Sequence, residues 1–196
     1  MNAKKPQQKS SVRIIAGRWR NSRIHFLPGD GLRPTGDRVR ETLFNWLSPI
    51  IMQSRCLDLF AGSGILGMEA LSRGASQIVF VEKSNQAANT LRSNLERIGA
   101  ESYQLFNTDA ESWLQRQHNG EQFDIVFLDP PFALDGLQHF CNRLEEKALL
   151  SEGAFVYAES PSHSRETVTP QNWRIFRQKT AGDVRFCLYQ RDAVRK

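Results

Sequence analysis

The sequence predicts an α/β fold in which a mostly parallel sheet carries an antiparallel hairpin at its C-terminal edge. Two observations predict it. From about residue 55 to residue 159, short apolar runs alternate with longer amphipathic segments, which is the pattern of strands joined by crossover helices. Further on, two strand-like runs follow each other without a helix between them. With 196 residues, 40% of them hydrophobic, the chain can bury one sizeable core.

The segment before the alternating part is predicted to add a small hairpin and one helix. Residues 1–11 are polar and rich in Lys and Gln, and we expect them to form a disordered basic tail. A hairpin over 12–17 and 23–26, with Trp19 in its turn, precedes an amphipathic helix over 38–47. We therefore divide the chain into a tail (1–11), an N-terminal extension (12–48) and a main domain (49–196).

Strands and helices alternate through the main domain, and right-handed crossovers make such strands parallel. The expected strands are 55–59, 77–81, 102–106, 123–128 and 154–159, the expected helices between them are 65–73, 85–98, 110–117 and 137–143, and the hairpin strands are 173–177 and 184–190. In this order the first and fourth strands are neighbours across the point where strand order reverses. Sheets of this kind bind ligands beyond the carboxyl ends of the strands at that point.

A glycine-rich turn joins the first strand of the main domain to its helix. The run is Cys56-Leu57-Asp58-Leu59-Phe60-Ala61-Gly62-Ser63-Gly64-Ile65-Leu66-Gly67. This is the layout of a nucleotide-type cofactor loop, because glycine lets the backbone approach a ligand closely. Its second half also spells G-x-G-x-x-G, so a dinucleotide site is the alternative.

Two details favour S-adenosylmethionine over NAD. The carboxylate of Asp58 suits the cationic ammonium of a methionine moiety better than an anionic pyrophosphate, and the loop lacks a basic residue to meet phosphates. Glu82 ends the next strand, where a ribose-binding acid is expected. Asp109 is placed to bind the adenine amine, and it would equally cap the helix that follows it. The residues expected to bind the cofactor are Asp58, Phe60, Gly62, Gly64, Glu82, Asp109 and Ala110.

The tetrapeptide Asp129-Pro130-Pro131-Phe132 follows the fourth strand and points to chemistry on a base. The carboxylate of Asp129 and the carbonyl of Pro130 can each accept one hydrogen of an exocyclic amine, and the prolines fix the chain without donating to the sheet. Phe132 offers a face on which the base can stack. Asp129, Pro130 and Phe132 are therefore the candidate catalytic residues. A proline-rich turn with no chemical role is the other interpretation.

The two motifs together resemble the Rossmann-like methyltransferases that act on exocyclic amines of nucleic-acid bases. With Gly31-Leu32-Arg33-Pro34-Thr35 and the run from Asp37 to Leu47, the chain resembles the bacterial family that methylates guanine N2 in 16S ribosomal RNA, at guanine 966. The resemblance covers all but the first dozen residues. It implies S-adenosylmethionine as cofactor and 16S ribosomal RNA, within the small ribosomal subunit, as partner. Residues that would hold RNA or close over the methionine end are Arg33, Thr35, Arg38 and Arg40; capping and solvation of the helix are the alternative roles.

Charge is unevenly distributed along this basic chain, whose net charge is +5. Residues 1–40 hold ten Lys and Arg against two acids, residues 41–164 hold eight against sixteen, and residues 165–196 hold eight against three. Basic ends around an acidic centre favour RNA-binding rims beside a separate chemical site, although such runs are often only solvated surface.

Composition limits the classes of protein to which the chain can belong. We find no membrane-length apolar run and no secretory leader, and we expect a cytoplasmic monomer. The three scattered cysteines are expected to be reduced structural thiols, and the four histidines show no metal spacing, so no metal is assigned. Two alternatives stay open: an N6-adenine methyltransferase acting on DNA or RNA, and a protein-amine methyltransferase or non-catalytic cofactor sensor. The basic ends argue against a protein substrate, and the intact tetrapeptide argues against a non-catalytic sensor.

Overall fold

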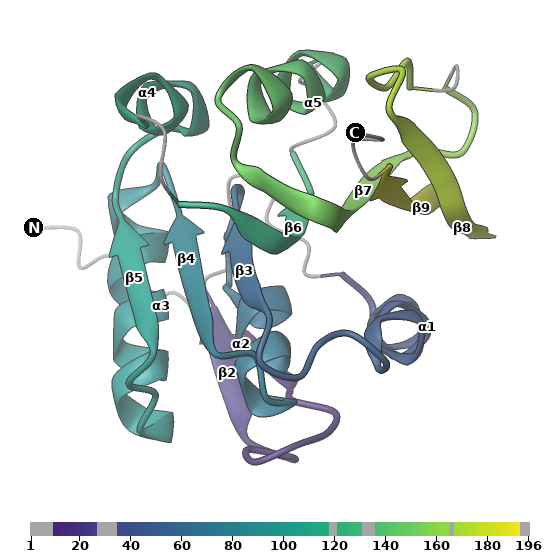
Figure 1. Cartoon of the computed structure of the whole chain (residues 1–196). Helices are drawn as coiled ribbons and strands as arrows, with labels where there is room; N and C mark the ends of the chain where they lie inside the picture. Colours follow the sequence, from purple (N-terminus) through teal and green to yellow (C-terminus); the bar gives the residue numbers. More distant parts are fainter. Residues whose placement is uncertain (1–9, 27–34, 118–120, 131–135, 165–166, 193–196) are drawn as a thin grey trace, which may run out of the picture.

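A seven-stranded sheet forms the centre of the molecule in the computed structural model, which describes residues 10–26, 35–117, 121–130, 136–164 and 167–192. The strand order is β5-β4-β3-β6-β7-β9-β8 (Figure 1). The five parallel strands are β3 (Arg55–Asp58), β4 (Gln77–Val81), β5 (Tyr103–Phe106), β6 (Phe123–Leu128) and β7 (Leu150–Pro161), and the antiparallel hairpin is β8 (Trp173–Ala181) with β9 (Val184–Arg191). The predicted fold is confirmed, and so is the pairing of the first and fourth parallel strands, β3 with β6.

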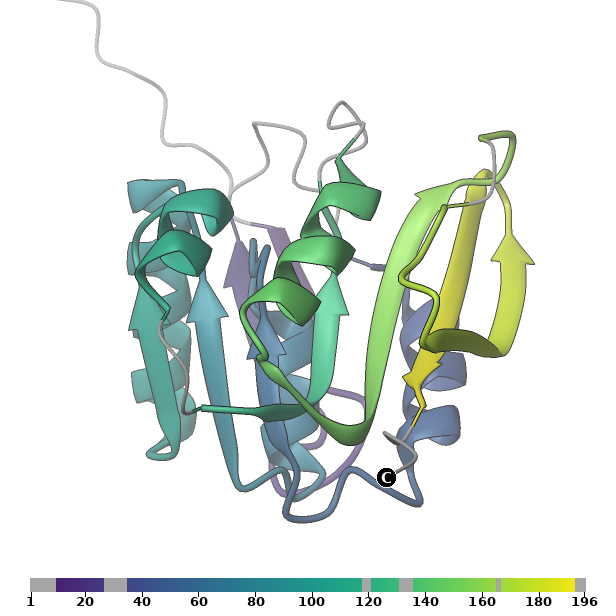
Figure 2. The ribbon, with the colours of Figure 1, turned by 45° about the horizontal axis from the view of Figure 1, so that its top comes forward.

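Helices cover both faces of the sheet. The helices are α1 (Asp37–Leu47), α2 (Ile65–Ser72), α3 (Asn85–Ile98), α4 (Ala110–Arg116) and α5 (Leu137–Glu146). Seen from the side in Figure 2, α4 and α5 lie in front of the sheet and α1, α2 and α3 behind it. Each strand contributes side chains to the apolar layers on both faces of the sheet, because successive side chains point to opposite faces. In β3, Cys56 belongs to the layer under α1, α2 and α3, whereas Leu57 belongs to the layer under α4 and α5.

The N-terminal hairpin, β1 (Ser10–Arg13) with β2 (Arg23–Phe26), packs on the layer of α2 and α3. Its first strand ends earlier than the predicted 12–17. The reason is that the next backbone groups bind α2: the amide of Ile15 donates to Glu69, and the carbonyl of Ala16 accepts from Ser72 Oγ at 2.6 Å. Gly17 has φ +85°, and a Cβ there would lie 1.8 Å from the Ser72 carbonyl oxygen. Trp19 lies in the turn, as predicted.

The C-terminal strands are longer than predicted. β7 begins at Leu150 rather than 154, and β8 continues to Ala181 rather than 177. Pairing explains both extensions, because Leu150 pairs with Phe123 of β6, and β8 is bonded to β9 as far as Ala181. Polar residues in β8 hide this continuity in the sequence. No helix in the described part of the chain has the length and apolar character needed to cross a bilayer.

Candidate active site

The candidate site lies where the strand order reverses, beyond the carboxyl ends of β3, β6 and β7. The glycine loop leaves β3 after Asp58, and Asp129 directly follows β6. In the register of β6 and β7, Leu128 pairs with Ala158, so Asp129 and Glu159 come next on neighbouring strands. Parallel strands therefore bring three carboxyl groups, from Asp58, Asp129 and Glu159, to one edge of the sheet.

The glycine loop adopts the conformation that its sequence predicts. Gly62 and Gly64 have φ of +53° and +75°, and Gly64 forms the N-cap of α2. A side chain at Gly64 would be strained by the positive φ, and its Cβ would lie 2.2 Å from Leu91 Cδ1, so Leu91 would have to move. The amide of Ala61 donates to the Val81 carbonyl at 2.9 Å, which holds the loop against the end of β4.

Asp58 is a buried acid at the start of this loop. One of its carboxylate oxygens accepts from the amide of Gly67, 3.3 Å away, at the first turn of α2. The pKa of Asp58 is raised from 3.8 to about 7, mainly by burial and also by the negative charge of Glu82, against the lowering effect of that hydrogen bond. The side chain is 2% exposed. An acid held in this way gains most from a cationic partner.

Glu82 holds the loop from the neighbouring strand. Its Oε2 accepts from the amide of Gly62 at 2.7 Å, and its Oε1 accepts from the amide of Ser84 at 2.6 Å. Asp109 caps α4 by accepting from the amide of Ser112 at 2.8 Å, which lowers the pKa of Asp109. Capping by Asp109 is thus observed, whereas ribose binding by Glu82 and adenine binding by Asp109 and Ala110 stay predictions.

Asp129 is half-buried and faces Thr35, the residue two positions before α1. The Thr35 hydroxyl lies 3.3 Å from Asp129 Oδ2 and 2.9 Å from Glu159 Oε1. Burial raises the pKa of Asp129 well above its usual range, and the charges of Glu159 and Asp58 raise it further. Pro130 is buried beside Asp129. The predicted positions Arg33, Pro131 and Phe132 lie outside the described residues, as do residues 1–9 of the predicted tail.

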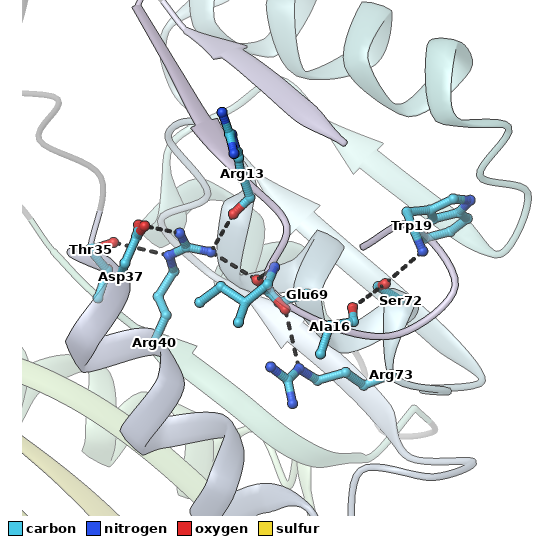
Figure 3. Close-up of polar contacts among 10 residues, drawn as sticks. Arg13, Ala16, Trp19, Thr35, Asp37, Arg40, Glu69, Ser72 and Arg73 are labelled. Carbon is cyan, nitrogen blue, oxygen red and sulfur yellow. Dashed lines mark hydrogen bonds and ion pairs between the residues drawn. The ribbon is translucent and has the colours of Figure 1, made fainter. Parts of the chain in front are cut away.

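Arg40 supports Thr35 from inside the molecule, as Figure 3 shows. The guanidinium donates to the Thr35 carbonyl at 3.2 Å and to the Arg13 carbonyl at 3.0 Å, and it forms ion pairs with Glu69 at 2.8 Å and Asp37 at 2.6 Å. Its side chain is 0% exposed. The expectation that Arg40 contacts RNA or covers the cofactor is therefore wrong for this arrangement, because no part of the guanidinium is accessible. Arg38 is exposed on the same helix and stays a candidate contact.

Two acids of the site region were not predicted from the sequence. Glu69 is fully buried in α2, where it binds Arg40 and Arg73. Glu159 is 6% exposed and also accepts from the Tyr157 hydroxyl at 2.7 Å. The signal for Glu159 was an acid at the carboxyl end of an otherwise apolar strand, next to the strand of the tetrapeptide. Within the described residues, no three His, Cys, Asp or Glu side chains gather as metal ligands.

Comparison with known proteins confirms the family resemblance. The model of the family described as Conserved hypothetical protein 95 matches residues 12–190. A relative from Haemophilus influenzae, named ribosomal RNA small subunit methyltransferase D, is 45% identical over 94% of this chain and 96% of its own length. The Escherichia coli protein of the same name is 43% identical over 97% and 96%. A solved Escherichia coli structure, the candidate methyltransferase yhhF, superimposes with a TM-score of 0.85 at 41% identity, covering 94% of this chain and 99% of that one.

Proposed function

Because this chain belongs to the family of the ribosomal RNA small subunit methyltransferases D, we propose that it transfers a methyl group from S-adenosylmethionine to the N2 amine of a guanine in 16S ribosomal RNA, guanine 966. The substrate would be the small ribosomal subunit or an intermediate of its assembly, met in the cytoplasm. The observation that carries the proposal is the position of Asp129 and Pro130, directly beside the glycine loop at the edge where β3 and β6 meet.

The charges around the loop fit this cofactor. Asp58 is buried. The charge of Glu82 raises the pKa of Asp58, and the charge of Asp58 raises the pKa of Asp129. Such a cluster favours a ligand that carries positive charge, as the ammonium and sulfonium of S-adenosylmethionine do, over the pyrophosphate of a dinucleotide. In the proposed complex Asp58 binds the ammonium, Gly62 and Gly64 let the backbone approach, Glu82 binds the ribose, and Asp109 with Ala110 meets the adenine.

Asp129 and Pro130 would act on the target amine. When bound, the cofactor supplies an electrophilic methyl carbon. Guanine N2 is a weak nucleophile because its lone pair is delocalised into the ring, and the Asp129 carboxylate and Pro130 carbonyl each accept one amine hydrogen to free that pair. Phe132 is proposed to stack on the base. Holding the two reacting atoms together supplies much of the rate, since effective molarities can contribute about 7–11 kcal/mol.

The basic ends of the chain support an RNA substrate. In β8 the side chains of Arg174, Arg177 and Lys179 are exposed. Exposed cations of this kind bind phosphates without reading sequence, and they would orient the RNA while the acidic centre holds the cofactor.

The test is methyl transfer by the purified protein to small ribosomal subunits from cells that lack it, with the modified nucleoside identified by mass spectrometry. We expect methylation of guanine N2 at a single site. Methylation of adenine N6 would establish the adenine alternative, and no transfer to ribosomal RNA would refute the proposal.

Asp129→Ala is the matched variant for the chemical step. We expect its single-turnover rate to fall by about 10²–10³, by analogy with the loss of one well-placed group that stabilises a transition state. Cofactor binding measured by calorimetry should change much less than the rate, because Asp58 is proposed to bind the ammonium whereas Asp129 acts on the amine. Transfer at the unaltered rate would mean that the tetrapeptide is only a turn.

A further inference from the structure

Three oxygen-bearing side chains connect Asp129 to the interior of the sheet. The Thr35 hydroxyl lies between the carboxyl groups, 3.3 Å from Asp129 and 2.9 Å from Glu159. The Tyr157 hydroxyl donates to the same Glu159 oxygen at 2.7 Å. Tyr157 and Glu159 are two residues apart in β7, so they point to the same face of the sheet, the face on which α1 packs.

Hydrogen-bond counting assigns the charges within this group. A threonine hydroxyl carries one hydrogen and can donate it to only one acceptor. The shorter contact is to Glu159, which also accepts from Tyr157. Two donors stabilise the ionised form of Glu159, whereas Asp129 is left with the longer contact. As the pH rises, Glu159 is therefore ionised before Asp129.

We propose that Glu159 is a positioning residue that acts across the Thr35 hydroxyl to make Asp129 a stronger proton acceptor for the methylated amine. The inference rests on the proposed function. In the step it concerns, the N2 lone pair forms the bond to the methyl carbon, and the carbon–sulfur bond breaks with its electron pair going to sulfur. The N2 cation then gives a proton to an Asp129 oxygen, and the N–H electron pair returns to N2.

The electrostatics of the surrounding groups agree with this role. Among the described residues, the titratable groups that act on Asp129 or Glu159 are Asp58 on β3 and Tyr157 on β7. Beyond them, Cys187 on β9 acts on Tyr157, and Arg40 on α1 donates to the Thr35 carbonyl. After burial, the charge of Glu159 is the largest influence that raises the pKa of Asp129. A general base becomes more effective as its pKa approaches the working pH.

The dependence of Asp129 on the charge of Glu159 gives a sharp test. The measurement is the pH profile of single-turnover methyl transfer at saturating S-adenosylmethionine, so that cofactor binding does not contribute. Activity should fall as pH drops through the pKa of Asp129. Glu159→Gln keeps shape and hydrogen bonds but removes the charge, so this acidic limb should move to lower pH. Thr35→Val keeps shape but removes the hydroxyl that donates to Glu159, so Glu159 should hold its charge less readily and the limb should also move to lower pH, and Thr35→Ser should restore it.

The controls separate this inference from the proposed function. Asp129→Asn should lack the limb altogether, which identifies the titrating group. If the unaltered protein transfers methyl but Glu159→Gln leaves the limb in place, or moves it to higher pH, Glu159 does not set the basicity of Asp129. If Glu159→Gln does not fold, the direction of the shift in Thr35→Val decides: a limb that stays or moves to higher pH overturns the inference. Absence of transfer by the unaltered protein would instead refute the function itself.

Discussion

Replacing Asp58 by Asn should make the free protein more stable and, at the same time, a poorer binder of cofactor. The amide oxygen of Asn keeps the shape of the side chain and can accept from the amide of Gly67, as the carboxylate oxygen does at 3.3 Å. The replacement removes only the charge, which is buried and lies near the like charge of Glu82. Burial without a cation makes this charge a cost to the free protein.

The magnitude follows from the pKa of Asp58, which is raised from 3.8 to about 7. Between these values the unfolded chain ionises while the native carboxyl stays protonated. The unfolded state then binds fewer protons, so the free energy of unfolding falls as pH rises, by about 1.36 kcal/mol per pH unit. Over the interval of about three units the loss reaches about 4 kcal/mol, complete above pH 7. In the Asp58→Asn variant the free energy of unfolding does not undergo this fall as the pH rises.

The assay is urea unfolding of the free protein at pH 5 and pH 8, for the unaltered chain and for Asp58→Asn. The stability advantage of the variant should be larger at pH 8 than at pH 5. Calorimetry at pH 8 should show cofactor affinity reduced by about 1.5–3 kcal/mol, the value of a hydrogen bond to a charged group. A variant that binds S-adenosylmethionine as tightly as the unaltered protein, or whose advantage does not grow with pH, would refute the assignment of Asp58.

Two further replacements test the residues that hold the site. Glu82→Ala removes the acceptor of the Gly62 amide and of the proposed ribose bond, so cofactor affinity should fall by about 1.5–3 kcal/mol in the same calorimetric experiment; unchanged affinity would exclude a ribose contact. Arg40→Met leaves Glu69 buried without its closest cation, and should lower the free energy of unfolding by about 3–5 kcal/mol, measured by urea unfolding. The control Arg38→Ala changes an exposed arginine of the same helix and should alter stability by less than about 0.5 kcal/mol.

The sequence was sufficient for the order and pairing of the central strands because their signals are local. Apolar runs of four to six residues and a glycine turn define β3, β4 and β6 whatever the rest of the chain does. The ends of β1 and β7 were misplaced because distant partners determine them. Glu69 and Ser72 in α2 bind the backbone groups that follow β1, and pairing with Phe123 of β6 makes β7 begin at Leu150.

The same distinction explains what was missed in the site. Asp58 and Asp129 stand in short motifs whose chemistry is visible in the sequence. Glu159 has no motif of its own, and its importance depends on a register that places it beside Asp129. Arg40 could not be assigned correctly because an arginine on an amphipathic helix looks the same whether it faces solvent or a buried glutamate. Two of its acceptors, the Arg13 carbonyl and Glu69, come from segments 27 and 29 residues away.

Docking of the N-terminal hairpin on α2 and α3 also bears on how the protein is made. The amides of Trp19 and His25 bind acceptors that lie 53 and 69 residues further along the chain. During synthesis at about 5–20 residues per second, the hairpin therefore waits roughly 3 to 14 seconds for its docking surface. Glu159 is made later still, whereas Thr35 is among the first residues of the site to leave the ribosome. A nascent chain accordingly brings Asp58, Asp129 and Glu159 together only after β7 has been synthesised.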